Sequence, residues 1–491
     1  MKRMNTSLHR LYRAVLVLFL ILGASTTWFT VLGAPALNND PRNTRAIYHE
    51  YAIPRGAITA SNGTVLAHSV PTKDAYRFKR VYTNGTLYAP VTGYFSIISR
   101  AGGGIESAEN SLLTGQNDAL WWQRFTSIFS GRSNEGATIE TSIDTKLQQT
   151  AARVLGNQHG AIVAIEPSSG RILALYSSPS YDPNILATHD GKAATQAYNS
   201  LSSDNPSPLL STATSQTMPP GSQFKLVVAT AALESGTYRE DTRIPAVASY
   251  TLPGTQTQLT NATHPELYNS SSTLTLSDAL AYSSNTAFAQ LGVTLGASTI
   301  AKTAEKFGFN SRITIAGTPS TGTPLRSAAS IFPQNATNDR LALASIGQGD
   351  TTATPLQMAL VSAAIANRGT LMQPTLVDRV RGSDLSVISQ TSPTVRSHVM
   401  SSSSASQLND MMQQVTAKFT PYVAPANTKV AVKTGTAQTG VGNTGIDAWI
   451  TGFAPADDPK IAICVMVRNA GTYAGDTAGP LFRQMLEAAL K

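Results

Sequence analysis

The sequence predicts an α+β protein, in which an antiparallel sheet is flanked by helices and preceded by a small α+β module and one N-terminal transmembrane helix. Three observations indicate this class. An uncharged apolar stretch lies near the N-terminus. At both ends of the main unit, apolar residues occur in the short runs and alternations that are typical of strands. In its middle, apolar residues recur with helical spacing. Strands from the two ends of such a unit pair into one sheet, and the helices between them pack on its faces.

The apolar stretch near the N-terminus covers residues 14–33 and contains no charged side chain. About 20 such residues in a helix cross a hydrocarbon core of roughly 30 Å. Basic residues are concentrated before the stretch, at Lys2, Arg3, Arg10 and Arg13. The positive-inside rule therefore predicts a cytoplasmic tail at residues 1–13, a single-pass anchor in the cell membrane and an extracellular remainder.

A cleaved signal peptide is the competing interpretation of this stretch. Ala34-Pro35-Ala36 resembles a small-residue cleavage site. The apolar region of a signal peptide is usually about 7–15 residues long, and this stretch is longer. Its length therefore favours an uncleaved anchor.

Residues 34–138 are predicted to form the small α+β module. Two Asn-Gly pairs, Asn62-Gly63 and Asn84-Gly85, interrupt short apolar runs in this region. Asn-Gly between alternating apolar residues is a strong signal for a tight turn, so we expect a β-hairpin around the first pair.

The main unit is predicted over residues 139–491. It opens with helical spacing from Thr145 to Leu155 and continues with two apolar strands around Pro167-Ser168-Ser169-Gly170. Further helices are expected at residues 222–235, 276–295, 297–307, 354–367 and 403–418, with a terminal helix at 479–490. The late strands are expected at residues 428–434, 446–454 and 460–468.

Composition narrows the classes of function. The net charge of +8 suits a protein near an anionic membrane or wall polymer, but no basic stripe with interleaved aromatic residues indicates nucleic acid. The single cysteine, Cys464, has no intramolecular disulfide partner and is expected to lie on a buried strand. The seven histidines lack metal-ligand spacing, so neither a metal nor a cofactor is expected.

Three short motifs carry the chemistry, and the first is Ser222-Gln223-Phe224-Lys225. Pro219-Pro220-Gly221 before it favours a helix start, so the Ser222 hydroxyl lies in the positive field of the helix dipole. Lys225 is three residues further on and shares the same helix face. A lysine in a dehydrated cleft loses proton affinity and can act as the general base for a serine. Alone, this spacing is a weak signal, because an exposed polar helix face explains it equally well.

The second motif is Ser283-Ser284-Asn285, at the start of a helical pattern. A hydroxyl and an amide two residues apart can point into one cleft. Ser283 can then relay a proton towards a leaving group, and Asn285 can hold a substrate peptide. A serine that caps a helix is the ordinary explanation of such a sequence.

The third motif is Lys433-Thr434-Gly435-Thr436, which follows an alternating apolar run and is therefore expected on a strand. Its lysine and two threonine hydroxyls can bind a carboxylate, and Gly435 lets a substrate approach the backbone closely. The backbone N–H groups of Thr436 and Ser222 can form an oxyanion hole, worth about 3–4 kcal/mol per donor. A solvated lysine at a strand end is the alternative for this motif alone.

Three weak motifs in one order, each in its expected structural context, rarely occur by chance. They form the set found in serine enzymes that acylate on penicillin and on peptides ending in D-Ala-D-Ala. Nearly the whole chain resembles the class B penicillin-binding proteins, the monofunctional peptidoglycan DD-transpeptidases, and is most similar to the actinobacterial penicillin-binding protein A type. Further family-like stretches are Arg55-Gly56-Ala57-Ile58, residues 178–183, residues 346–349 and residues 447–455.

The resemblance implies a serine β-lactamase/transpeptidase-like fold behind a pedestal module, and it implies a role for each motif. Ser222 would be the acylated nucleophile and Lys225 its base. Ser283 and Asn285 would relay protons and hold the substrate. The substrate-binding residues would be Lys433, Thr434, Gly435 and Thr436, which receive the donor carboxylate and complete the oxyanion hole.

The implied reaction joins two peptidoglycan stem peptides. The serine attacks the D-Ala-D-Ala bond of one stem, the last D-Ala leaves, and an amine of a neighbouring stem takes the acyl group. β-Lactam antibiotics would be inhibitors. The resemblance also implies a partner, a polytopic SEDS-family glycosyltransferase of the division or elongation machinery, contacted through the anchor and the pedestal.

Several rivals share these motifs. A class A β-lactamase needs a glutamate to activate the deacylating water, but no glutamate occurs between Glu305 and Glu487. A DD-carboxypeptidase uses water as acceptor and shares every catalytic residue. A non-enzymatic penicillin-binding scaffold also stays open, whereas a penicillin sensor needs a cytoplasmic output domain and residues 1–13 are too few for one.

Overall fold

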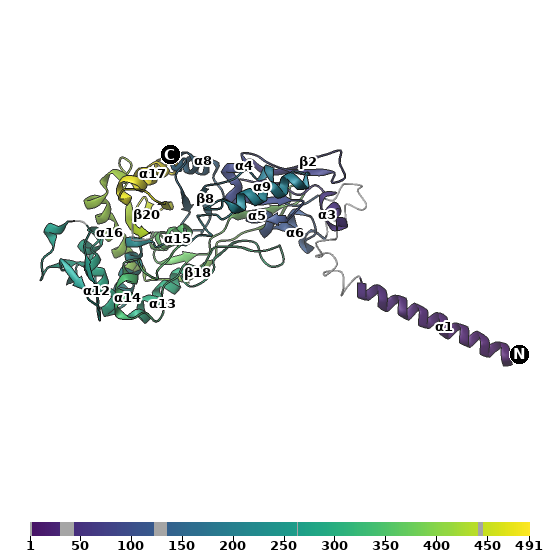
Figure 1. The fold of residues 1–491 in the computed structure, drawn as a ribbon, viewed down its shortest axis with the longest axis horizontal. Coiled ribbons are helices and arrows are strands. Elements are labelled where there is room, and N and C mark those ends of the chain that lie inside the picture. Colours follow the sequence, from purple (N-terminus) through teal and green to yellow (C-terminus); the bar gives the residue numbers. More distant parts are fainter. Residues whose placement is uncertain (1, 30–43, 122–134, 263, 440–444) are drawn as a thin grey trace.

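The computed structural model describes residues 2–29, 44–121, 135–262, 264–439 and 445–491. Its first helix, α1 (Lys2–Thr27), stands apart from an elongated folded body (Figure 1). Elements of the N-terminal module gather at the end of the body nearest α1, and most helices of the larger unit gather at the other end. The N-terminal module and most helices of the larger unit thus lie at opposite ends of one body.

Helix α1 contains most of the predicted membrane anchor. The part that is long and apolar enough to cross a membrane runs from Leu8 to Thr27, and none of it is buried in the protein. The predicted span, residues 14–33, overlaps this part from residue 14 to residue 27, and the helix continues N-terminally through the basic tail. Arginines near a helix end can extend their charged tips to the interface while their stems stay apolar. Residues 30–33 of the predicted span lie outside the described residues.

A five-stranded antiparallel sheet forms the centre of the larger unit, in the order β19-β20-β21-β7-β8. Its strands are β7 (Gly160–Ile165), β8 (Ile172–Ser178), β19 (Ala431–Thr439), β20 (Gly445–Ala454) and β21 (Ile461–Val467). The pairing of β21 with β7 joins the two ends of the unit, which confirms the predicted architecture. Cys464 lies on β21 and is fully buried, as expected.

Helices cover both faces of this sheet because its central strands are apolar on both sides. On one face pack α8 (Thr145–Leu155) and α17 (Ala474–Ala489), and on the other pack α15 (Pro355–Ala366) and α16 (Ser402–Phe419). The bounds of α8 agree with the prediction. The terminal helix was predicted too short, since α17 begins before residue 479 and continues through Pro480.

The larger unit contains further helices and short 3-10 turns. They are η3 (Pro183–Ile185), α9 (Gly191–Ser203), η4 (Gly221–Phe224), α10 (Lys225–Glu234), η5 (Pro265–Leu267), α11 (Leu276–Ala281), α12 (Asn285–Leu295), α13 (Ala297–Phe307), α14 (Asn338–Ser345) and η6 (Pro421–Val423). The predicted single helix over residues 276–295 is wrong. It breaks at Ser283, whose φ of 56° is left-handed, and Ser284 caps the new helix α12.

Short strands complete the larger unit. They are β9 (Arg243–Pro245), β10 (Ser249–Thr251), β11 (Gln258–Thr260), β12 (Thr273–Thr275), β13 (Thr314–Ala316), β14 (Leu325–Arg326), β15 (Thr370–Met372), β16 (Val377–Arg381), β17 (Val387–Gln390) and β18 (Val395–His398). Strands β10 and β11 form an antiparallel hairpin beside α12.

The N-terminal module is built on a second sheet, in the order β17-β16-β6-β1-β2-β3. Its own elements are α3 (Thr44–Tyr51), β1 (Ile58–Thr59), β2 (Val65–Pro71), β3 (Phe78–Tyr82), α4 (Gly85–Thr92), β4 (Tyr94–Ser96), β5 (Arg100–Gly102), α5 (Gly104–Ala108), α6 (Asn110–Leu113), η2 (Asp118–Leu120) and β6 (Thr138–Thr141). The predicted hairpin around Asn62-Gly63 is confirmed by the antiparallel pair β1–β2. Asn84 instead precedes a helix, α4.

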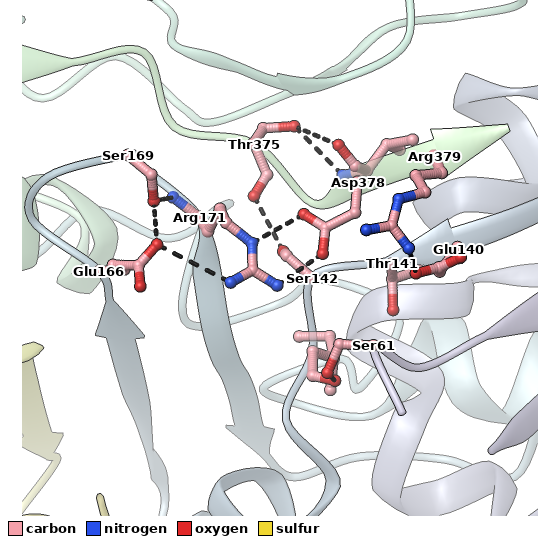
Figure 2. Close-up of polar contacts among 12 residues, drawn as sticks. Ser61, Glu140, Thr141, Ser142, Glu166, Ser169, Arg171, Thr375, Asp378 and Arg379 are labelled. Carbon is pink, nitrogen blue, oxygen red and sulfur yellow. Dashed lines mark hydrogen bonds and ion pairs between the residues drawn. The ribbon is translucent and has the colours of Figure 1, made fainter. Parts of the chain in front are cut away.

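Strands β16 and β17 belong by sequence to the larger unit but extend the sheet of the N-terminal module. Polar contacts fix this junction (Figure 2). Arg171, next to the β7–β8 turn, donates from Nε to Asp378 Oδ1 on β16 at 2.9 Å. Glu140 on β6 accepts from Arg379 Nη1 and Arg381 Nε, each at 2.9 Å. The Arg171–Asp378 pair thus ties the two sheets together, and the Glu140 contacts hold β16 against β6 within the second sheet.

A buried ion cluster holds the N-terminal module itself. Glu106 on α5 is fully buried and accepts from Arg55 Nε at 2.5 Å and Arg80 Nε at 2.6 Å. Burial alone would raise the pKa of Glu106, but Arg80 and Arg55 outweigh it and hold that pKa below its ordinary value. The charged carboxylate is therefore the form that the fold requires.

Replacing Glu106 with alanine is expected to destabilise the protein by about 3–5 kcal/mol, because two buried guanidinium groups lose their carboxylate. The urea midpoint of the full chain measures this loss. Glu487→Ala is the control, since it removes the exposed partner of Arg483 and is expected to cost less than about 1 kcal/mol. Equal midpoints for the two variants would contradict a structural role for the cluster.

Candidate active site

The three sequence motifs meet where α10, α12 and β19 come together. Ser222 lies in η4, a single turn that leads directly into α10, and Lys225 is the first residue of α10. Ser283 stands in the break between α11 and α12, and Lys433 lies on β19. Each motif therefore has the local structure that the sequence predicts for it.

Close backbone packing places η4 against β19. Gly221 has a φ of 55°, and a Cβ there would come within 2.7 Å of Thr436 O. At Gly435 a Cβ would come within 2.5 Å of Pro220 O. Larger residues at these two positions would push the strand away from the turn. Ser222 is therefore held beside the backbone of Thr436.

Lys225 is the centre of the cluster and is fully buried. Its Nζ lies 3.0 Å from Ser222 Oγ, and it donates to Ser283 O at 2.6 Å and to Asn285 Oδ1 at 2.8 Å. A neutral amine has two N–H groups and one lone pair. With both N–H groups bound to these acceptors, the lone pair can face the Ser222 hydroxyl.

The second lysine completes the hydrogen-bond chain. Lys433 is fully buried, and its Nζ donates to Ser283 Oγ at 2.9 Å and to Thr434 O at 2.9 Å. Ser283 Oγ also lies 3.3 Å from Lys225 Nζ. The Ser283 hydroxyl thus connects the two lysines, and the left-handed backbone of Ser283 allows this position.

Burial controls the charge state of both lysines. It lowers the pKa of Lys225 well below its ordinary value, and the nearby Lys433 lowers it further. Burial also lowers the pKa of Lys433 to about 7. Neither lysine forms an ion pair with any residue that the structure describes. The lowered pKa favours the neutral amine of Lys225, the form that can accept a proton from Ser222.

The second motif contains both a capping serine and two residues that contact Lys225. Ser284, the middle residue, caps α12 and accepts from Ala287 N at 3.3 Å. Ser283 and Asn285 on either side of it contact Lys225. The ordinary capping role therefore belongs to the one residue of the motif without a predicted catalytic function.

The sequence did not predict that a segment outside the three motifs forms hydrogen bonds with Asn285 and its neighbours. Asn285 Nδ2 donates to Thr260 O at 3.2 Å, and the next residue, Asn261, bonds to Ser284 and Thr286. Nothing in this polar stretch distinguishes it from an ordinary loop. As for a metal, no group of three or more His, Cys, Asp or Glu in the described ranges is placed to hold one.

The chain matches known proteins over almost its full length. Residues 160–487 match the penicillin binding protein transpeptidase domain, and residues 55–139 match the penicillin binding protein A dimerisation domain. The peptidoglycan D,D-transpeptidase PbpA of Mycolicibacterium smegmatis is 40% identical over 499 residues, which cover 99% of both chains. The chain belongs to the class B penicillin-binding protein transpeptidases.

Solved structures of this family agree with the fold. The ceftriaxone acyl-enzyme complex of penicillin-binding protein A from Mycobacterium tuberculosis superposes with a TM-score of 0.83. The two are 37% identical, and the match covers 90% of this chain and all of that chain. The penicillin G acyl-enzyme complex of the same protein has a TM-score of 0.80 at 38% identity, over 89% of this chain and all of that one. The α+β fold with a preceding dimerisation module is thus confirmed.

Proposed function

We propose that this class B penicillin-binding protein is a peptidoglycan DD-transpeptidase that forms an acyl-enzyme on Ser222. The observation that carries the proposal is the position of Lys225 Nζ, 3.0 Å from Ser222 Oγ with acceptors for both its N–H groups. This is the geometry of a serine activated by a neutral base. The names of the relatives give the same reaction.

Acylation proceeds in two proton transfers. Lys225 takes the proton of Ser222 as its Oγ attacks the carbonyl carbon of the D-Ala-D-Ala bond. The backbone N–H groups of Ser222 and Thr436 stabilise the oxyanion, and Gly435 leaves room for the substrate beside β19. The proton then passes through the Ser283 hydroxyl to the leaving nitrogen, the C–N bond breaks, and D-Ala departs.

The substrate is held from both sides of the nucleophile. Asn285 binds the stem peptide, and Lys433 with the hydroxyls of Thr434 and Thr436 attracts the terminal carboxylate of the donor. In the second half-reaction, an amine from a neighbouring stem attacks the ester carbonyl and Ser222 leaves with a proton. The product is a cross-link between two stems.

Penicillin enters the same site as a substrate analogue. Attack of Ser222 opens the β-lactam ring, but the broken bond leaves the amine attached to the acyl group. No separate leaving group departs, so the acceptor side stays occupied. The absence of a glutamate between Glu305 and Glu487 supports slow deacylation, unlike a class A β-lactamase.

We place the catalytic unit on the extracellular side of the cell membrane. The basic residues before the apolar part of α1 support a cytoplasmic N-terminus. The unburied surface of α1 and the N-terminal module beyond it are available to a membrane partner. We propose a polytopic SEDS-family glycosyltransferase of the division or elongation machinery as that partner, with the anchor and the pedestal (residues 34–138) as the contact.

A DD-carboxypeptidase is the second candidate, since it uses the same residues with water as acceptor. The two are separated by incubating the full chain in detergent with glycan strands that carry pentapeptide stems. Transpeptidation yields cross-linked stem dimers and one released D-Ala per cross-link. Release of D-Ala without dimers would overturn transpeptidation in favour of hydrolysis. If penicillin labels the chain but neither product appears, a penicillin-binding scaffold is the better description.

A further inference from the structure

A hairpin outside the three motifs supports the second of them. Strands β10 and β11 lead into Asn261, which lies against the start of α12. The hairpin has no side chain in the cluster of Ser222, Lys225 and Ser283. Its contacts are with the backbone and side chains that set where Ser283 and Asn285 point.

Asn261 uses both ends of its amide on this turn. Its Oδ1 accepts from Ser284 Oγ and from Thr286 N, each at 3.1 Å. Its Nδ2 donates to Val247 O at 3.2 Å and to Thr286 Oγ1 at 3.1 Å. Ser284 and Thr286 are fully buried, so water cannot readily replace these bonds. One side chain thus connects the hairpin to both neighbours of Asn285.

The residue before Asn261 fixes the amide of Asn285 itself. Asn285 Nδ2 donates to Thr260 O, which leaves Asn285 Oδ1 directed at Lys225 Nζ, 2.8 Å away. The carbonyl of Ser283 is the other acceptor for Lys225, at 2.6 Å. Both acceptors that orient the lysine lone pair therefore lie on the turn that Asn261 holds.

We propose that Asn261 is a positioning residue for acylation, which keeps Ser283 O and Asn285 Oδ1 in place so that the Lys225 lone pair faces Ser222. The proposal rests on the roles of Ser222 and Lys225 given above. Asn261 touches neither the nucleophile nor the base. Its effect passes through the backbone of residues 283–286, which includes the left-handed residue Ser283.

The geometry explains why this position needs an amide. An asparagine supplies an acceptor and a donor on one short, planar group, and both are used here. Alanine would leave Thr286 N without its partner and would release the turn. A shift of about 1 Å in a catalytic group can cost about 100-fold in rate. The loss of Asn261 is therefore expected to lower the rate constant rather than only the amount of folded protein.

The test is the rate constant of acylation by a chromogenic penicillin, measured by stopped flow across pH and normalised to the active sites titrated by burst amplitude. Asn261→Ala in the full chain is expected to lower the rate constant at least 10-fold. We also expect the acidic limb of its pH profile to move to higher pH, because water that reaches Lys225 favours its charged form. Asn269→Ala is the matched control, since it removes an exposed amide from the same segment and leaves residues 283–286 untouched.

A purely structural role gives a different result. In that case the burst amplitude or the thermal midpoint of Asn261→Ala would fall, but its rate constant per active site and its acidic limb would match those of Asn269→Ala. This outcome would overturn the proposal. A double variant with Asn285→Ala adds a check. Because Asn261 is proposed to act partly through Asn285, the two effects should combine to less than their product.

A second variant serves if Asn261→Ala does not fold. Asn261→Asp keeps the acceptor for Thr286 N and loses the donor to Val247 O. We expect an intermediate rate constant and an acidic limb at higher pH, because the new carboxylate favours a charged Lys225; wild-type values for both would overturn the proposal. If the proposed function fails because Ser222 is not the nucleophile, Ser222→Ala will still be acylated in the same assay. This result is distinct from a failure of the Asn261 proposal.

Discussion

Replacing Ser222 with alanine is expected to abolish covalent labelling by penicillin. The variant lacks the oxygen that forms the ester. The neighbouring hydroxyl of Ser283 accepts from Lys433 Nζ at 2.9 Å and lies farther from Lys225 Nζ, at 3.3 Å, than the Ser222 hydroxyl does, at 3.0 Å. Because alanine fits the same turn, the fold should stay intact. Labelling of the full chain with a fluorescent penicillin, read on a denaturing gel, measures the loss.

Ser235→Ala provides the matched control for this variant. Ser235 stands at the other end of α10, where its hydroxyl donates to Ala232 O and accepts from Thr237 N, so its loss should leave labelling unchanged. Full labelling of the Ser222 variant, with the adduct on another residue, would remove the assignment of the nucleophile.

Replacing Lys225 with alanine is expected to reduce the acylation rate constant by a factor of roughly 100 to 10,000, the usual contribution of a positioned base. Without the amine, none of the described residues keeps a hydrogen-bond contact to Ser222 Oγ through which it could accept the proton. The substitution removes no ion pair, since Lys225 makes none with the residues that the structure describes. We therefore expect the thermal midpoint to change little compared with the rate.

The pH dependence follows from the same lysine. Burial and the proximity of Lys433 lower the pKa of Lys225, which favours the neutral base. As the pH falls through this lowered pKa, Lys225 gains a proton and wild-type acylation is expected to slow. Lys225→Ala should lack this limb, whereas Lys302→Ala, an exposed change on α13, should keep both the rate and the limb. An unchanged rate in the Lys225 variant would exclude this residue as the base.

Much of the fold could be predicted because its central strands carry an unambiguous signal. β7 and β21 are buried on both faces and consist of apolar residues. Turns separate these apolar runs from the neighbouring elements, so the sequence identifies the runs as strands. Helix α8 was bounded correctly, because Asp144 caps its start and Gly156 follows its end. Ser222 lies just before α10, Ser283 lies just before α12, and Lys433 lies on β19, which are the local structures that the sequence predicts for the three motifs.

Other features depend on contacts between distant parts of the chain. Strands β16 and β17 are short and half exposed, and they become strands by pairing with β6 of the N-terminal module. The break between α11 and α12 depends on the left-handed conformation of Ser283, which the sequence does not mark with a glycine. The sequence does not indicate a role for Asn261 for a similar reason, because its proposed role depends on the packing of the hairpin on α12.

The central claim is that Ser222 forms a slowly hydrolysed acyl-enzyme. Intact-mass spectrometry of the full chain after mixing with penicillin, followed over hours and with peptide mapping, tests it most directly. We predict one adduct of the mass of intact penicillin, on the peptide that contains Ser222, which persists through the time course. Rapid loss of the adduct with accumulation of hydrolysed penicillin, or an adduct on any other peptide, would contradict it.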